Sequence, residues 1–463
     1  MRIEQEYKKT GYFWLPEEPD KKIPGTLTIS DGGKIELEII GSFDERPKPF
    51  DAVNEIDRII GNVERDGFVT LERCFYTYEP IFVSGISKSF LHVDCVLSGV
   101  AYDKDEQVTF NTLSFSVDCI DQWVGISGIG VETDLESKTA TISYKHPGNL
   151  SYSLANGMRL EICFGCTFPG FPNITEAKIT QNAYFRLCAE EPRPLKDFSE
   201  IAWKITQLLC FAIDTTVSLK GLRATSNEIQ RTIGNSKPYP VPINVYYESI
   251  PFSEKEPKID HHKMVFTFGI IKDNAGDVFN KWIDAYDLLA PALGLYFSTK
   301  TGAQEYLDGK FLALAQGIET YHRRTSDEKL MDDLEFEELV KSIMKHCPEE
   351  RSKWLNGRLK YGNEISLRKR IKRMVEPFKE YFGNQSDIDR MIGRIVDTRN
   401  YLTHYDESLN PKAAQGRGLW LLYSKMEAIY QLHFLKVIGF ADDEVSSVVE
   451  NCYTLKRKLG ALP

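Results

Sequence analysis

The residues with the clearest potential for chemistry lie near the C-terminus, in the run RNYLTH at positions 399–404. When the 2′-hydroxyl of RNA attacks the adjacent phosphate, the reaction needs a base, an acid for the leaving oxygen and a positive charge for the phosphorane. Histidine can act as base or acid near neutral pH, and arginine is permanently charged and forks onto phosphate oxygens. Arg399 and His404 could therefore cleave RNA without a metal ion. The alternative is structural, with His404 capping helix carbonyls and Arg399 in a surface ion pair.

The spacing of this pair carries a further expectation. Of the eight histidines in the chain, only His404 has an arginine five residues before it. In an ideal helix, that separation leaves the two side chains about 140° apart. They converge only where the helix ends or distorts, or where two copies meet across an interface. We therefore expect at least a dimer, with the motif at the interface.

Helical periodicity governs the second half of the chain, and short loops between amphipathic helices predict an antiparallel bundle. Asn356-Gly357 is expected to break a helix, and the run from Ser386 to Asp389 resembles an N-terminal capping box. The predicted helices span 276–289, 303–324, 335–346, 364–382, 386–404, 411–438 and 442–458.

Alternating apolar and polar residues in the first half of the chain predict short strands. Many short strands predict a β-rich sandwich or barrel, here with one helical insertion at about 195–218. Asp31-Gly32-Gly33 separates two alternating runs and indicates a hairpin. The expected fold class is thus α+β and multidomain: a β-rich, sandwich-like domain at 1–255, a linker and last strand at 256–274, and an all-α bundle at 275–463. The further strand-like runs span 67–76, 90–101, 108–119, 138–145, 159–167, 175–188, 241–248 and 263–270.

Charge marks a second candidate surface. The chain has a formal net charge of −10, yet residues 351–373 carry nine basic side chains and a single acid, Glu364. This clustering predicts an RNA-binding face on which Trp354 and Tyr361 could stack bases. The alternative is a solvated helix face. The residues expected to contact RNA are Lys360, Arg368, Lys369, Lys372 and Arg373.

The remaining motifs in the sequence do not indicate a metal, a cofactor or a membrane segment. The pair Cys163 and Cys166 lacks a second pair at zinc-site spacing, so buried thiols are expected, and neither a metal nor another cofactor is predicted. No Walker loop, G-x-S-x-G or H-E-x-x-H motif occurs. Scattered cysteines, the absence of a long apolar run and a polar start predict a cytoplasmic protein without a membrane partner.

The run at 399–404, late in a helical domain, resembles the motif of HEPN ribonucleases. Residues 310–323 (KFLALAQGIETYHR) and 397–405 (DTRNYLTHY) are similar to the ApeA-like HEPN family specifically. Residues 11–16 (GYFWLP) and 24–27 (PGTL) resemble the β-rich domain that precedes HEPN in ApeA proteins. The resemblance thus touches both halves of the chain.

This resemblance implies a bacterial antiphage, abortive-infection endoribonuclease that is metal-independent, leaves a cyclic phosphate, and acts on RNA such as tRNA anticodon loops. It implies a homodimer with a composite cleft, in which Arg399 and His404 are the catalytic pair and Asn400 the polar member. Asp406 stands where HEPN toxins paired with nucleotidyltransferase antitoxins have a tyrosine, which argues against that subclass.

Two further residues and two rival functions complete the expectations. Glu319 is expected either to orient Arg399 or to be a solvated charge, and His322 to be exposed or capping. The β domain is expected to bind a phage-derived trigger, since no catalytic constellation stands out in it. The rival functions are an inactive HEPN module for dimerisation or RNA binding, and a ligand-binding β domain as the main activity.

Overall fold

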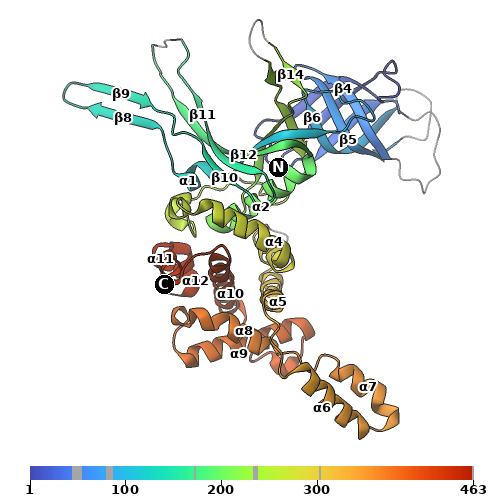
Figure 1. Cartoon of the computed structure of the whole chain (residues 1–463), viewed down its shortest axis with the longest axis vertical. Helices are drawn as coiled ribbons and strands as arrows, with labels where there is room; N and C mark the ends of the chain where they lie inside the picture. The colour runs from blue at the N-terminus through green and yellow to red at the C-terminus, as the bar shows by residue number, and fades with distance from the viewer. Residues whose placement is uncertain (44–54, 80–86, 172–173, 233–237, 302–303, 461–463) are drawn as a thin grey trace. The chain divides into compact units, whose positions relative to one another are not determined.

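A computed structural model describes residues 1–43, 55–79, 87–171, 174–232, 238–301 and 304–460 (Figure 1). The first residue of the helix predicted at 303–324 and the last three of the predicted bundle lie outside this description. The chain divides into two compact units, Met1–Ile283 and Asp284–Pro463. Each is considered by itself below.

The first six strands form a closed antiparallel barrel. They follow the order β6-β3-β2-β1-β4-β5, and β5 pairs again with β6, which closes the ring. Alternating side chains fill the barrel with a continuous apolar core that includes Phe13, Leu27, Leu37, Leu71 and Leu91. Of the sandwich and the barrel that the sequence allowed, these strands form the barrel. The hairpin expected at Asp31-Gly32-Gly33 is confirmed and joins β2 to β3. The strands are β1 Tyr7–Trp14, β2 Ile23–Ile29, β3 Ile35–Ile40, β4 Glu55–Val63, β5 Gly67–Tyr78 and β6 Lys88–Ser98.

Further strands extend the sheet outward from β6 in the order β16-β13-β7-β12-β11-β10. The expected helical insertion is α2, Leu195–Ile213, which packs on β12 and β7 through a largely buried face. The outer strands are β7 Thr109–Val117, β10 Leu150–Ser153, β11 Arg159–Thr167, β12 Thr180–Pro194, β13 Leu219–Thr225 and β16 Ile243–Tyr247. Two small hairpins and one short helix complete the unit: β8 Ile129–Asp134, β9 Thr139–Tyr144, β14 Gln230–Arg231, β15 Tyr239–Pro240 and α1 Ile120–Val124.

The strand expected at 263–270 is wrong. This segment forms a 3-10 turn, η1 His261–Lys263, and a short helix, α3 Phe268–Ile271. Between them, the backbone N–H groups of Val265 and Phe266 both donate to the carbonyl of Ala212 at the end of α2. The indole of Trp123 donates to the Phe266 carbonyl at 3.1 Å. The apolar residues of this segment are buried because the connection packs against α2. A buried connection and a buried β-strand can show the same apolar pattern, so the sequence could not distinguish them.

The second unit is helical. Helix α5 packs against α8, α9 and α10, and α10 packs against α11 and α12, around a core that includes Tyr296, Tyr430 and Phe434. Helix α4, Ala275–Ser298, begins in the first unit and continues into the second. The other helices of the second unit are α5 Leu307–Thr325, α6 Asp333–Lys345, α7 Glu349–Leu359, α8 Leu367–Val375, η2 Glu376–Tyr381, α9 Gln385–His404, η3 Glu407–Leu409, α10 Gly416–Val437, α11 Asp442–Asn451 and α12 Tyr453–Leu459.

Two local expectations in this unit were wrong. Asn356 and Gly357 lie inside α7 instead of breaking it, because glycine in an exposed helix costs only about 1 kcal/mol relative to alanine. The N-cap of helix α9 is Asn384, whose side chain accepts the N–H of Asp387, so Ser386 is not the cap. Within the described residues, no helix has the length and apolar character needed to cross a membrane.

Candidate active site on helix α9

The candidate catalytic run occupies the last turns of α9. Buried apolar side chains at i, i+3, i+4 spacing hold this helix in place by packing against α5 and α8. Thr398 is fully buried, and its hydroxyl accepts the backbone N–H of Ala414 at 2.8 Å. That bond ties the segment before α10 to α9, directly beside Arg399. The buried apolar residues of α9 are Ile388, Met391, Ile392, Ile395 and Leu402.

Arg399 is half-buried and already has a polar partner. Its Nη1 donates to the Asn400 side-chain oxygen at 3.1 Å, and the Thr403 hydroxyl donates to the Arg399 carbonyl at 2.7 Å. This contact joins Arg399 to Asn400, the polar member of the predicted site, whereas the predicted catalytic role of both residues stays a prediction. A guanidinium with free N–H groups at this place can still fork onto a phosphate.

His404 is the last residue of α9 and is exposed. Tyr405 follows in the left-handed conformation with φ of 52°, and its N–H closes the helix on the Tyr401 carbonyl. Among the described residues, no hydrogen bond joins His404 to Arg399. The helix stays regular up to His404, so the two side chains leave it in different directions, as the spacing indicates. Asn400 lies one turn before His404 on the same side.

Glu319 on α5 lies in a charged network that the sequence did not reveal. It accepts a hydrogen bond from Arg323 at 3.0 Å, and Arg323 also pairs with Glu364. The expectation that Glu319 orients Arg399 stays a prediction that no described contact supports. Arg323 and Glu364 lie far apart in the sequence, so helical spacing could not predict that they pair.

The expectation for His322 was wrong, because this side chain is buried. Arg370, itself only 3% exposed, points a guanidinium nitrogen at His322 Nδ1 at 3.2 Å. Burial, and secondarily the charge of Arg370, lowers the pKa of His322. A neutral imidazole accepting from arginine is consistent with that environment. The role of this pair is to join α5 to α8.

The basic stretch divides into paired and unpaired cations. Glu328 accepts two hydrogen bonds from Arg373, at 2.8 and 2.9 Å, and pairs with Lys369 at 3.1 Å. These contacts lower the pKa of Glu328 to about 2. Two of the five expected RNA contacts, Lys369 and Arg373, therefore share one carboxylate within the chain.

The other three cations have no ion pair among the described residues: Lys360, Arg368 and Lys372. The Arg368 guanidinium lies over Gly393 of α9, where an added Cβ would meet it at 3.4 Å. Gly393 precedes His404 by eleven residues, close to three whole turns, so Arg368 lies on the His404 side of the helix. The Lys360 ammonium lies 5.4 Å from the Tyr361 ring centroid.

The remaining motifs show no further site. Cys163 is buried in β11 and Cys166 is half-buried, both as free thiols. The described segments contain no group of three or more His, Cys, Asp or Glu side chains that could hold a metal ion.

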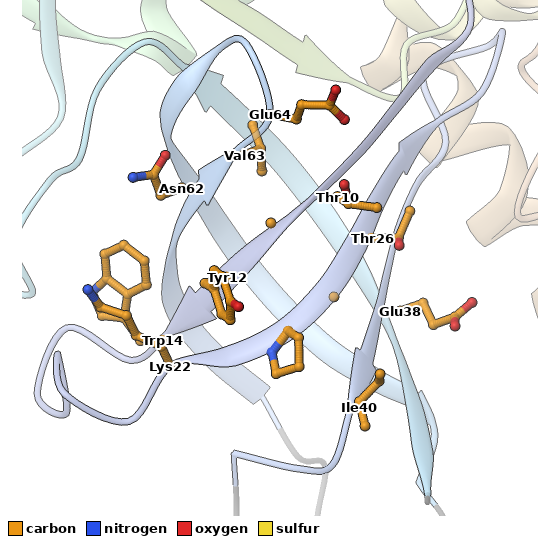
Figure 2. A pocket seen from close by; sticks show the side chains of 13 residues that line it. Thr10, Tyr12, Trp14, Lys22, Thr26, Glu38, Ile40, Asn62, Val63 and Glu64 are labelled. Atoms are coloured by element: carbon orange, nitrogen blue, oxygen red, sulfur yellow. The ribbon is translucent and has the colours of Figure 1, made fainter.

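A concave groove of about 670 Å³ lies on the barrel wall formed by β1 to β4 (Figure 2). Tyr12, 57% exposed, lines it together with Asn62, Glu38 and other polar side chains. Gly11 and Gly25 are cross-strand partners in its floor. A Cβ on Gly11 would lie 2.3 Å from the Asn62 carbonyl oxygen, so only glycine permits this close approach of strands. The groove is a candidate binding site of the first unit.

Comparison with known families covers both units. A model described as ApeA N-terminal domain 1 matches residues 8–282, and a model described as Apea-like HEPN matches residues 312–444. No curated protein and no solved structure matches the chain. The first match covers more than half of the chain, and the second contains the whole of α9.

Proposed function

The chain belongs to the ApeA family, with an ApeA N-terminal domain followed by an Apea-like HEPN domain, and on this premise we propose that it is an endoribonuclease that stops translation during phage infection. Family membership supports a nuclease-type role in antiphage defence. The finer proposal is cleavage of tRNA in the anticodon loop, without a metal ion, by attack of the 2′-hydroxyl to leave a cyclic phosphate.

The observation that carries the proposal is the arrangement at the end of α9. Arg399 is held by Asn400 and retains N–H groups that can stabilise the charge of the phosphorane. His404 is exposed and reaches solvent at the helix end, where it can take the 2′-hydroxyl proton or protonate the leaving oxygen. Because one helix presents the two side chains on different sides, the proposed active site combines Arg399 of one copy with His404 of another.

Mixing of inactive subunits tests this site. Arg399→Ala and His404→Ala should each abolish RNA cleavage while leaving the fold intact. Equal mixing of the two variants should restore about a quarter of wild-type activity, because half of the dimers are mixed and each of these holds one intact composite site. The assay is cleavage of tRNA by purified chains that have been dissociated and reassembled together. Near-normal cleavage by His404→Ala alone would refute the site.

The RNA path is proposed to run from the end of α9 over α8. Arg368 and Lys372 supply the phosphate contacts there, with Lys360 further along. Lys369 and Arg373 lie on the same helix but are held by Glu328, so their contribution depends on breaking those ion pairs. Phosphate contacts set affinity and orientation, whereas Arg399 and His404 carry the chemistry.

The trigger is proposed to bind the first unit at the groove beside Tyr12. The groove offers an exposed aromatic ring together with carboxylate and amide groups, a combination suited to recognising a polar molecule or a peptide. Replacement of Tyr12 by alanine should leave RNA cleavage by the purified enzyme unchanged and abolish protection of cells against phage. Full protection by this variant would place the trigger elsewhere.

A further inference from the structure

Helices α6 and α7 form a hairpin that extends from the rest of the helical unit (Figure 1). Neither helix contains a buried residue. Phe336, Val340 and Met344 recur at every fourth position of α6 and are half-buried, as are Leu355 and Leu359 of α7. These five side chains form the seam between the two helices.

One side of this hairpin is apolar and uncovered. Leu339 and Ile343 are 43% and 37% exposed, and Trp354 is 63% exposed. Each residue of a helix is rotated by about 100° from the one before it. Measured from the seam in this way, the side chains of all three residues fall on the same side of the hairpin. Two short helices that expose such a stripe gain little stability alone, so an additional layer on this side would stabilise them. We call this side, defined by Leu339, Ile343 and Trp354, the hairpin face.

On the hairpin face, the two helices present charges of opposite sign. Glu335 of α6 and Arg351 and Arg358 of α7 lie along the hairpin face by the same count. None of these three forms an ion pair with any residue that the structure describes. Taken whole, both helices have mixed charge, because α6 also carries Lys341 and Lys345 and α7 also carries Glu349 and Glu350. The opposite charges used below are therefore those of Glu335, Arg351 and Arg358 on the hairpin face.

We propose that the hairpin face binds the hairpin face of a second copy of this chain. A two-fold axis parallel to the helices lays α6 of one copy over α7 of the other, antiparallel, in a four-helix bundle. This arrangement sets Glu335 of each copy level with Arg358 of the partner subunit. The alternative two-fold axis, across the helices, would place α6 on α6 and α7 on α7, and the second contact would bring Arg351 close to Arg358 of the partner subunit.

The size of the contact defines its role. Helix α6 is about 20 Å long, so a two-helix face covers roughly 400 Å² per copy, about half of a standard interface. The hairpin therefore acts as an arm that reinforces the dimer, and this inference rests on the proposed dimer with a composite active site. RNA is the competing occupant, since Arg351 and Arg358 lie on this face, but it would leave Glu335, Leu339 and Ile343 without a complementary surface.

A matched pair of substitutions tests the proposal in the full chain, with His404→Ala present to prevent cleavage. Leu339→Glu should raise the dimer dissociation constant about 100-fold, because two-fold symmetry places the new charge in the interface twice. Leu334→Glu is the control: this leucine is 72% exposed on the same helix but faces away from the hairpin face. Sedimentation equilibrium measures the constant, and circular dichroism confirms that both variants keep their helices.

Charge exchange provides the second arm of the test. Glu335→Arg and Arg358→Glu should each weaken the dimer, and the double variant should regain most of the lost affinity. Equal dimerisation of Leu339→Glu and Leu334→Glu, or no recovery in the double variant, overturns the proposal. Loss of RNA affinity by Leu339→Glu with an unchanged dimer would overturn it in favour of an RNA surface.

The test of the hairpin face and the test of the proposed active site can fail independently of each other. If Leu339→Glu dimerises normally while Arg399→Ala and His404→Ala abolish cleavage, the hairpin face is wrong and the active site stands. If Leu339→Glu becomes monomeric while His404→Ala retains cleavage, the hairpin face is right and the active site is wrong.

Discussion

Replacement of Glu328 by glutamine should strengthen RNA binding. The carboxylate of Glu328 holds Arg373 through two hydrogen bonds and Lys369 through a third contact, so it neutralises a surface of α8 that otherwise carries only positive charge. Glutamine keeps the size of the side chain and removes the charge. Arg373 and Lys369 are then available to phosphate oxygens, next to the unpaired Arg368 and Lys372.

The magnitude follows from counterion release. Each additional phosphate contact to single-stranded RNA steepens the dependence of log affinity on log salt by roughly 0.7, so two contacts add about 1.4. Between salt concentrations of about 200 and about 50 mM, a fourfold change, the advantage of Glu328→Gln over wild type should grow about sevenfold. One freed contact in place of two would give about 2.6-fold.

The assay is fluorescence anisotropy of a labelled single-stranded RNA with the His404→Ala chain, titrated at several salt concentrations. Glu450→Gln on α11 is the matched control, because it makes the same charge change at an exposed glutamate outside this network. If Glu328→Gln binds with the affinity and salt slope of Glu450→Gln, the α8 surface does not contact RNA and the proposed path is wrong.

Three further outcomes are expected. Cleavage should persist in excess chelator and leave cyclic-phosphate ends; loss with EDTA and recovery with magnesium would refute the mechanism. Burial lowers the pKa of His433 to about 4, below its unfolded value near 6.5, so the unfolded state binds the extra proton and stability falls as pH drops through this window. Urea unfolding should show a loss of about 2 kcal/mol from His433 between pH 7 and about pH 5, and His433→Asn should reduce the pH dependence by that amount. Gly317→Ala should destabilise the bundle by about 2 kcal/mol or more, since its Cβ would lie 1.8 Å from the Tyr430 hydroxyl oxygen, whereas Gly357→Ala, with open space around it, should not.

Local sequence patterns were sufficient for the elements that depend on neighbouring residues. The switch from strand to helical periodicity near residue 275 and the helix that carries Arg399 and His404 follow from spacing alone. Barrel closure does not, because it depends on β5 pairing with β6 and β1 pairing with β4. Strand alternation is the same in a sandwich and in a barrel.

Charge patterns were informative about composition but not about partners. Nine cations with one acid between residues 351 and 373 predicted a basic face, yet Glu328, from outside that window, pairs with Lys369 and Arg373. Arg370 has a hydrogen-bond partner in His322, which lies 48 residues away. A count of charges within a window cannot detect such partners, and the contact of this face with RNA stays a prediction.

The burial of His322 and Arg370 also distinguishes His322 from His404, the histidine that we propose for catalysis. A histidine whose ring accepts from a buried arginine is held neutral and cannot easily gain a proton, because the added charge would face the guanidinium. His404, by contrast, lies at an exposed helix end and can exchange protons with solvent or substrate. Of His322 and His404, the packing leaves only His404 accessible. This exposure is a physical ground, independent of the motif, for proposing His404 over His322 for acid–base chemistry.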